Sequence, residues 1–289
     1  MHRPAVVPAV RHHGCVQVGG LSCVRIGSGP PVLFVHGWAG LKEGWAGLPR
    51  AIADAGFQAI LIDLPGWGES PAPRGFPHTP ESYGTALERA LIEIGPASII
   101  AHSMGAQGTL VLAIHRPRLV DKLVLLGPTL TPYRPATFPP KSHRDVVRYR
   151  LLGVPLTRLS LLWLRRDKER WRQSFLRAFA EPERLVGDPE LEQTLAVAST
   201  TLTTTSTRTL ACSAPPLLDF DARSWLHGVP QPTLGVIGDR DRVAVPGPAE
   251  ESLALMRNAR TMRVSGVAHF PHIEAEAPVT AAIIEHLSR

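Results

Sequence analysis

Short apolar runs that end at glycine or a polar residue alternate along this chain with segments of amphipathic helical spacing. The runs have the length of strands and cover 15–18, 22–26, 31–35, 57–62, 98–101, 122–126, 233–237 and 261–264. The helical segments cover 45–55, 81–94, 106–115, 248–257 and 278–287. Strands buried on both faces read as continuous apolar runs, because helices cover them. The alternation therefore predicts an α/β protein with a mostly parallel central sheet flanked by helices, opening with a hairpin across Gly19 and Gly20.

The alternation stops between about Tyr133 and Leu218, where no strand pattern occurs. Helical patterns there cover 146–152, 156–164, 169–179 and 191–210, separated by proline and glycine. We expect a helical lid inserted between two strands. The predicted domains are 1–132 and 219–289 for the two parts of the core and 133–218 for the lid.

Composition limits the class of protein. The chain has 289 residues, of which 44% are hydrophobic and 19% charged, as in globular proteins. Cys15, Cys23 and Cys212 form neither an even set nor a metal-ligand spacing, so free thiols in a reducing compartment are expected. A run of about 18 apolar residues, which a membrane span would need, does not occur, so a cytoplasmic protein is expected. Residues 131–215 hold 14 Lys and Arg against 8 Asp and Glu, which accounts for the net charge of +6. These arginines are mixed with acids and apolar residues, so a solvated helix face is favoured over an anion-binding or nucleic-acid-binding patch.

The strongest local motif is the run from Ser98 to Gly108, in which an apolar strand leads through Ser103 directly into a helix. Such a turn needs small residues two before and two after the serine, and Ala101 and Gly105 occupy these positions. The turn exposes the serine at the end of a strand and places the N–H of Met104 at a helix N-terminus. Ser103 is therefore a candidate nucleophile, and Met104 a candidate oxyanion donor.

Two other turns follow strands. In the first, His36 and Gly37 precede Trp38, whose N–H is the second candidate for the oxyanion hole. His36 itself is expected to bind backbone groups, because a histidine at a strand end more often fixes a turn than takes part in catalysis. In the second, Asp63 opens a turn that contains Pro65, Gly66 and Gly68, and it is expected to anchor that turn.

Taken together, these motifs resemble those of capped α/β-hydrolases. The matching pieces are the turn at 36–38, the segment 63–70, the elbow at 101–105, the segment 117–125 after the elbow helix, the segment Gly238 to Asp241, and the segment Gly266 to Glu274. They occur in the family's order over nearly the whole chain except the lid. The resemblance implies an acid and then a histidine after the serine.

Each of these two roles has a preferred residue and a rival. The family's Gly-x-x-Asp spacing selects Asp241 as the acid, while Asp239 suits the cap of the same turn. His269 is the expected base, in a loop after the strand at 261–264. The rival base is His272, whose position before Ile273 and Glu274 suits packing at the start of a helix. The predicted catalytic set is Ser103, Asp241 and His269.

The serine also limits the reaction. Epoxide hydrolases and haloalkane dehalogenases of this fold use aspartate at the elbow, so both are disfavoured. Meta-cleavage C–C hydrolases share the Asp-Leu-Pro-Gly turn, yet they usually have Trp after the catalytic histidine, where this chain has Phe270. Hydrolysis of a small, partly apolar carboxylic ester, lactone or thioester is the first hypothesis.

The alternatives left open are a C–C hydrolase, a lyase, a perhydrolase and a non-catalytic small-molecule binder. No metal or organic cofactor is expected, since His12 and His13 lack partners at ligand spacing. The expected partner is a small-molecule substrate, and neither the physiological substrate nor the oligomeric state follows from the pattern.

Overall fold

An eight-stranded sheet forms the centre of the protein. The computed structural model describes residues 16–132, 155, 158–159, 161–163, 165–185 and 187–289. The strands are β1 (Val16–Val18), β2 (Leu21–Ile26), β3 (Pro31–Val35), β4 (Gln58–Ile62), β5 (Ala97–His102), β6 (Val120–Leu126), β7 (Thr233–Gly238) and β8 (Ala259–Val264). Their order is β1-β2-β4-β3-β5-β6-β7-β8, in which β2 is antiparallel to β1 and β4 and the other pairs are parallel. The predicted mostly parallel sheet is confirmed.

The opening hairpin is also confirmed. Val18 pairs with Leu21, and the two residues between them, Gly19 and Gly20, have φ of +57° and +81°. A two-residue turn of this kind needs positive φ at both positions, which glycine adopts without strain. Cys15, the first residue of the predicted strand, lies outside the described residues.

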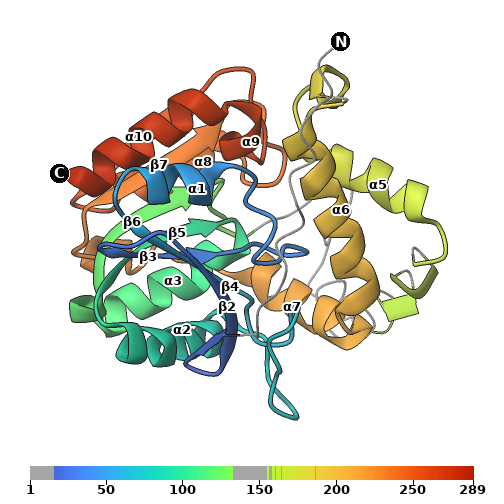
Figure 1. Ribbon diagram of the computed structural model, residues 1–289, viewed down its shortest axis with the longest axis horizontal. Helices are drawn as coiled ribbons and strands as arrows, with labels where there is room; N and C mark the ends of the chain where they lie inside the picture. The colour runs from blue at the N-terminus through green and yellow to red at the C-terminus, as the bar shows by residue number, and fades with distance from the viewer. Residues whose placement is uncertain (1–15, 133–154, 156–157, 160, 164, 186) are drawn as a thin grey trace.

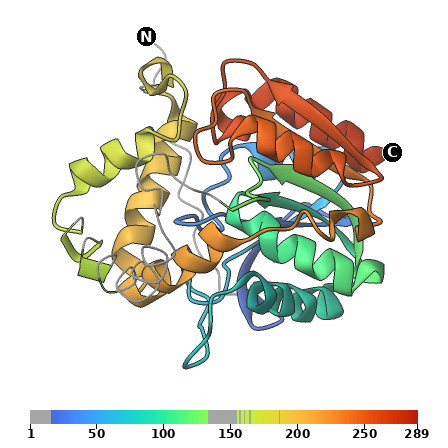
Figure 2. The ribbon, with the colours of Figure 1, turned by 180° about the vertical axis from the view of Figure 1, so that it is seen from behind.

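Helices cover both faces of the sheet, because successive strand residues point to opposite sides. Val32 and Phe34 of β3 pack with α1 (Leu48–Asp54) and α10 (Glu276–Ser288). Leu33 and Val35 belong to the other core, which includes α2 (Pro80–Ile94), α3 (Met104–His115) and α8 (Pro246–Ala254). Figures 1 and 2 show α10 and α2 on opposite sides of the sheet. The five helices agree with the predicted segments to within a few residues.

The parallel strands bring their carboxyl ends to one edge of the sheet. Strands β5, β6, β7 and β8 are neighbours in that order, so the loops that follow β5, β7 and β8 lie next to one another. Ser103 follows β5 directly, and Asp241 and His269 lie in the loops after β7 and β8. Ligand sites of open α/β sheets occur at this edge.

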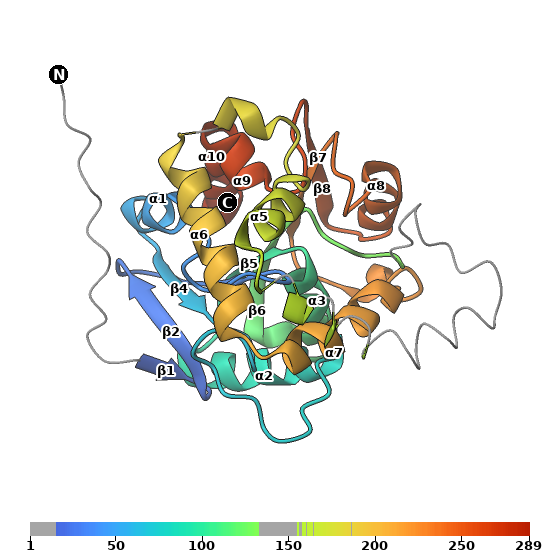
Figure 3. The same ribbon diagram turned by 90° about the vertical axis from the view of Figure 1, so that its right-hand side faces the viewer.

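Within the described part of the segment between β6 and β7, three α-helices lie at this same edge: α5 (Lys168–Leu176), α6 (Pro189–Thr204) and α7 (Thr207–Asp219). Figure 3 shows them in front of the ends of β5 and β6. Residues 161–163 are helical as well, whereas the predicted helix at 146–152 lies outside the described residues. We call α5, α6 and α7 the inserted helices.

The prediction of one helix over 191–210 is wrong. The chain ends α6 at Thr204 and begins α7 at Thr207, because Ser206 adopts an extended conformation and its hydroxyl accepts the N–H of Thr209. A serine at the N-cap satisfies an N–H that has no partner inside the helix, and so starts a new helix. In the described residues, no helix is long and apolar enough to cross a membrane.

Candidate active site

Ser103 has the backbone of a strained turn, with φ of 50° and ψ of −117° at the junction of β5 and α3. Positive φ is rare for residues other than glycine and marks functional strain when the surroundings enforce it. The surroundings here are tight, because a Cβ at Gly105 would lie 2.4 Å from the carbonyl oxygen of Val35. Gly105 therefore lets α3 approach β3 closely enough to hold the turn, as the sequence predicted for a small residue at this position.

The structure brings together the three side chains selected from the sequence. His269 Nε2 lies 2.9 Å from Ser103 Oγ, and His269 Nδ1 lies 2.8 Å from Asp241 Oδ2. A carboxylate only accepts, so Nδ1 carries the proton and Nε2 is free to accept from the serine hydroxyl. All three residues are at most 6% exposed.

The two candidate acids have different partners. Asp241 Oδ1 accepts the N–H groups of Val243 and Ala244 at 2.7 and 2.9 Å, which leaves Oδ2 directed at His269. Asp239 instead accepts from the N–H of Gly266 at 2.7 Å and from the hydroxyl of Ser265. The structure thus places Asp239 across the β7 and β8 loops as a turn anchor and Asp241 behind the imidazole.

Among the described residues, Ser103 Oγ hydrogen-bonds to His269 and not to His272, the rival base. His272 is 2% exposed, and burial together with the nearby His269 lowers its pKa to about 3. Its ring packs 5.5 Å from that of Trp45. His272 is therefore a buried neutral imidazole.

Backbone contacts fix the loop that carries His269. Its N–H donates to the carbonyl of Ala178 at 3.0 Å, and its carbonyl accepts from His102 Nε2 at 2.9 Å. Burial and the neighbouring His269 lower the pKa of His102 far below its usual range, so His102 is neutral. A Cβ at Gly127 would lie 3.1 Å from His269 Nδ1. Gly127 thus allows the end of β6 to pass directly beneath the imidazole.

The two candidate oxyanion donors belong to two different turns next to the serine. Met104 is the first residue of α3, where N–H groups have no partner inside the helix. Gly37, which precedes Trp38, is so close to the elbow that a Cβ on it would lie 3.0 Å from Ser103 Cβ. The indole N–H of Trp38 donates to Ser213 Oγ at 3.1 Å and to the carbonyl of Leu210 at 3.3 Å, both on α7.

His36 binds backbone groups, as expected. Its Nε2 accepts the N–H of Leu64 at 3.0 Å, so Nδ1 carries the proton and donates to the carbonyl of Gly37 at 2.8 Å. Burial lowers the pKa of His36, which favours this neutral form. The histidine connects the turn after β3 to the turn after β4.

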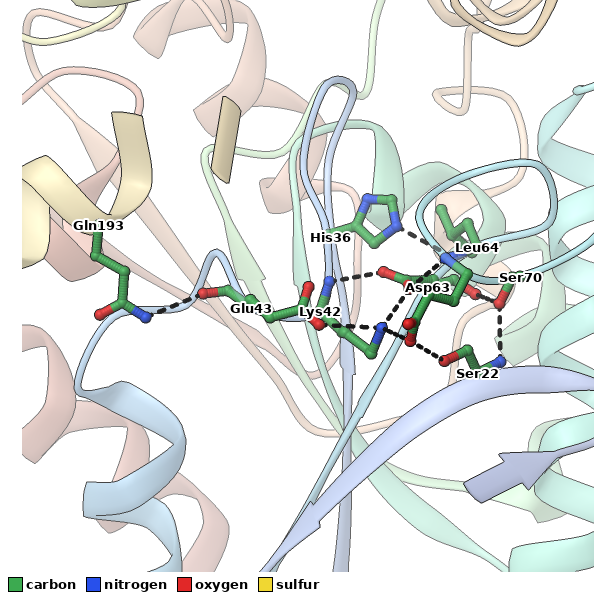
Figure 4. A network of polar contacts seen from close by, with 9 residues as sticks. Ser22, His36, Lys42, Glu43, Asp63, Leu64, Ser70 and Gln193 are labelled. Carbon is green, nitrogen blue, oxygen red and sulfur yellow. Dashed lines mark hydrogen bonds and ion pairs between the residues drawn. The ribbon is translucent and has the colours of Figure 1, made fainter. Parts of the chain in front are cut away.

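A buried lysine was not singled out from the sequence. Lys42 is 2% exposed, and its ammonium lies 2.8 Å from Asp63 Oδ2, 2.7 Å from Glu69 Oε2 and 3.0 Å from Glu43 Oε1. Burial opposes the charge of Lys42, but the carboxylates outweigh it and raise its pKa. In Figure 4 this network extends to α6, where Gln193 donates to the carbonyl of Glu43. The sequence signal for this buried lysine was the charged pair Lys42 and Glu43 inside the glycine-rich, apolar segment 37–47.

Glu274, at the end of the motif 266–274, has a structural role that the sequence pattern did not predict. Its Oε1 accepts the N–H groups of Ala268 and Phe270 at 3.1 and 3.2 Å, and its Oε2 accepts that of Ala180 at 2.8 Å. Burial raises its pKa, which these amides oppose. One carboxylate therefore joins the loop on both sides of His269 to the segment after α5.

Aromatic rings line the space between the inserted helices and the site. The Phe179 and Phe270 rings stack with centroids 4.8 Å apart. Among the apolar residues of the segment 161–179, Leu161 and Phe179 are buried, whereas Leu162 and Trp163 are 48% and 50% exposed. In the described part of the chain, no group of three or more His, Cys, Asp or Glu side chains is arranged to hold a metal ion.

The sheet, the helices on both faces and the serine elbow are those of an α/β-hydrolase fold. Residues 30–276 match the alpha/beta hydrolase fold family, and the chain belongs to that family.

Two curated relatives match in part. The chain is 31% identical to a probable lysophospholipase, BODYGUARD 4 of Arabidopsis thaliana, over 42% of this chain and 29% of that protein. It is 32% identical to a 2-hydroxy-6-oxononadienedioate/2-hydroxy-6-oxononatrienedioate hydrolase of Cupriavidus pinatubonensis, over 37% of this chain and 39% of that protein. The match therefore spans well under half the length of these relatives.

Solved structures match over most of the chain. An esterase from Exiguobacterium antarcticum superimposes with a TM-score of 0.76 at 20% identity, covering 93% of this chain and 96% of that one. An enol-lactonase from Burkholderia xenovorans gives a TM-score of 0.72 at 19% identity, with 93% and 96% covered. At these identities the likeness shows a shared fold.

Proposed function

We propose that this protein is a serine hydrolase that cleaves a small, partly apolar carboxylic ester, or a related lactone or thioester, through an acyl-enzyme. The observation that carries the proposal is the unbroken chain of hydrogen bonds from Ser103 through His269 to Asp241. A nucleophile, a base and a group that orients the base form the minimal set for acyl transfer.

In the proposed mechanism, Ser103 Oγ attacks the ester carbonyl while His269 Nε2 accepts the hydroxyl proton. Asp241 holds the imidazole in the required tautomer and stabilises its protonated form. The N–H groups of Trp38 and Met104 donate to the oxyanion of the tetrahedral intermediate. His269 then protonates the leaving alcohol, and a water molecule activated by the same imidazole hydrolyses the acyl-enzyme.

The surroundings of the serine favour an apolar substrate. Ser103 is 5% exposed beneath the inserted helices, and Phe175, Phe270 and Trp171 supply apolar surface nearby. A site shielded from water strengthens the oxyanion contacts and limits entry of polar compounds. Within this proposal, residues 133–218 act as a lid domain between the core parts 1–132 and 219–289.

Labelling with a serine-reactive fluorophosphonate tests the proposal. We expect stoichiometric capture by the wild type and none by Ser103→Ala. Turnover of a p-nitrophenyl ester should fall roughly 10⁴-fold in Ser103→Ala and in His269→Ala. A folded wild type that captures no label would instead support a non-catalytic binder.

A matched pair of variants tests the acid. Asp241→Asn should damage turnover far more than Asp239→Asn, because only Asp241 contacts the imidazole. The reverse order would assign the acid to Asp239.

A second candidate is hydrolysis of a C–C bond, favoured by the curated dienedioate hydrolase relative. The residue after His269 is Phe270, where meta-cleavage hydrolases usually have Trp. Purified protein offered a phenolic dienoate beside a p-nitrophenyl ester distinguishes the two, and product analysis also separates a lyase or a perhydrolase from an esterase.

A further inference from the structure

Four consecutive residues after α5 each contact the loop that carries the acid or the region that carries the base. We call this segment, 178–181, the docking segment. The contacts along it are Ala178 with His269, Phe179 with Phe270, Ala180 with Glu274, and Glu181 with Arg240. His269 and Phe270 belong to the base loop, 265–270, which continues into the short helix α9 (Pro271–Glu274). Arg240 belongs to the acid loop, 239–245, and directly precedes Asp241.

The core and the docking segment hold the backbone of His269 from two sides. Its N–H donates to the carbonyl of Ala178 at 3.0 Å, whereas its carbonyl accepts from His102 Nε2 at 2.9 Å. His102 is the last residue of β5, in the core, and Ala178 lies in the segment inserted between β6 and β7. The main chain of the proposed base is therefore positioned in part by the insertion.

Phe179 adds apolar packing to this contact. It is 3% exposed, and its ring stacks on that of Phe270 with centroids 4.8 Å apart and planes 11° apart. Leu191 and Leu195 of α6 and Ile273 of α9 complete the same buried cluster. An aromatic pair stabilises a contact beyond the burial of its area, so this cluster supplies the apolar part of the docking.

Glu181 extends the contact to the acid loop. Its carboxylate accepts from the Arg240 guanidinium and also pairs with Arg184. The N–H of Arg240 donates to the carbonyl of Val267 at 2.9 Å, so the acid loop and the base loop are joined at this residue. The Arg240 and Glu181 side chains are 52% and 26% exposed, so their ion pair contributes less than the aromatic cluster.

The proposed reaction depends on these contacts because His269 must keep two hydrogen bonds at once. Its imidazole lies 2.9 Å from Ser103 Oγ and 2.8 Å from Asp241 Oδ2. The three side chains come from three separate segments, and a displacement of about 1 Å can lower a rate about a hundredfold. A segment that fixes both the acid loop and the base loop therefore fixes the geometry on which proton transfer depends.

We propose that the docking segment is a positioning element for the catalytic set, so that acyl transfer proceeds only while residues 178–181 remain docked on the acid and base loops. The inference rests on the proposed function and gives the insertion a role beyond covering the site. Because the segment acts through His269 and Asp241, its loss lowers kcat and leaves KM nearly unchanged. A segment that only formed a wall of the substrate site would change KM instead.

The kinetic test removes both side-chain contacts of the docking segment. In the double variant Phe179→Ala with Glu181→Ala, kcat for p-nitrophenyl butyrate should fall about tenfold or more, since truncating a buried Phe is costly. KM should change little. A kcat equal to that of the wild type, or a loss confined to KM, overturns the proposal.

A matched double variant controls for the deletions themselves. Phe220→Ala with Glu192→Ala removes the same groups, but Phe220 packs against Trp225 and Glu192 pairs with Arg172. Its kcat should stay near that of the wild type. An equal loss of kcat in the two double variants shows a general effect of destabilisation and rejects the positioning role.

A milder pair of variants keeps the test valid if the double variants do not fold. Phe179→Leu retains a buried apolar side chain and loses the ring stack, so kcat should fall about two- to tenfold. Phe220→Leu, at a residue that is 8% exposed, should leave kcat unchanged. Equal kcat values in these two variants overturn the proposal.

Hydrogen exchange tests the docking without a substrate and so separates this inference from the proposed function. Exchange of the His269 and Ala180 amides should rise about two- to tenfold in Phe179→Leu and not in Phe220→Leu, because exchange reports how often a contact opens. The Nδ1–H resonance of His269, assigned by its loss in His269→Gln, should also exchange faster with water in Phe179→Leu.

If the wild type hydrolyses no ester, the proposed function fails and these exchange rates still decide the positioning role. Faster exchange at both the amide and the Nδ1–H of His269 in Phe179→Leu supports it. Exchange at His269 Nδ1–H that matches the wild type rejects it, since the docking segment then does not control the contact of His269 with Asp241.

Discussion

The indole N–H of Trp38 donates to the hydroxyl of Ser213, with 3.1 Å between Nε1 and Oγ. The contact joins the turn after β3 to α7, although the two residues are 175 positions apart. Ser213 Oγ in turn lies 3.2 Å from the carbonyl of Leu210 and donates to it, which fixes its own orientation. An inserted helix therefore holds the side chain of the residue whose backbone N–H is the proposed oxyanion donor.

Ser213→Ala is expected to lower kcat for a p-nitrophenyl ester by about three- to tenfold with little change in KM, since one neutral hydrogen bond is lost and the oxyanion contact acts in the transition state. Trp38→Phe removes the same bond while keeping the backbone N–H. If the bond is what matters, the double variant should be no worse than the poorer single variant. Additive losses in steady-state kinetics would contradict the link.

Glu274→Gln is expected to break the hydrogen bond from the Ala180 N–H while keeping those from Ala268 and Phe270. The amide can keep an oxygen toward Ala268 and Phe270 but then turns its NH₂ toward the N–H of Ala180. We expect kcat/KM to fall about tenfold or less, because the His269 loop loses its tie to the segment after α5. Hydrogen exchange should rise at Ala180. The exposed Glu276→Gln is the control, and equal exchange in both variants would reject this role.

Lys42→Met should destabilise the protein by about 3 to 5 kcal/mol, because it leaves the fully buried carboxylate of Asp63 without its cation. Urea unfolding followed by tryptophan fluorescence measures the loss. Arg50→Met removes an exposed ion pair with Asp54 and should have little effect. Similar unfolding midpoints for the two variants would show that the buried pair contributes no more than a surface pair.

The stability of the protein should depend on pH through His78. Burial, with a smaller contribution from Arg208, lowers its pKa to about 4, and its Nδ1 lies 3.0 Å from Tyr83 Oη. In the unfolded chain His78 becomes protonated below a pH of about 6.5, whereas in the folded protein it becomes protonated only near pH 4. The free energy of unfolding therefore falls as the pH drops through this window.

His78→Asn should make that fall less steep by about one proton, and asparagine accepts the positive φ of 55° at this position. Urea unfolding between pH 7 and pH 4 measures the slope. A His78→Asn slope equal to that of the wild type would contradict the assignment.

Local sequence patterns were sufficient to predict a structural feature when all the residues that determine it lie in one segment. The strand, Ser103 and the helix after it are adjacent in the sequence, and so are the glycine turn and strands of the opening hairpin. The break between α6 and α7 depended on one N-cap serine within a threonine-rich run, and there the periodicity misled.

The sequence by itself determined the α/β alternation, the elbow at Ser103 and the short list of acids and histidines, because these depend on periodicity and on spacing within one segment. Only the tertiary structure decided which of them meet: Asp241 rather than Asp239 contacts His269, and His269 rather than His272 hydrogen-bonds to Ser103. It also decided the partners of Lys42 and Glu274. The reason is physical, since a contact between segments many residues apart depends on how the sheet and helices pack, and no local pattern encodes that distance.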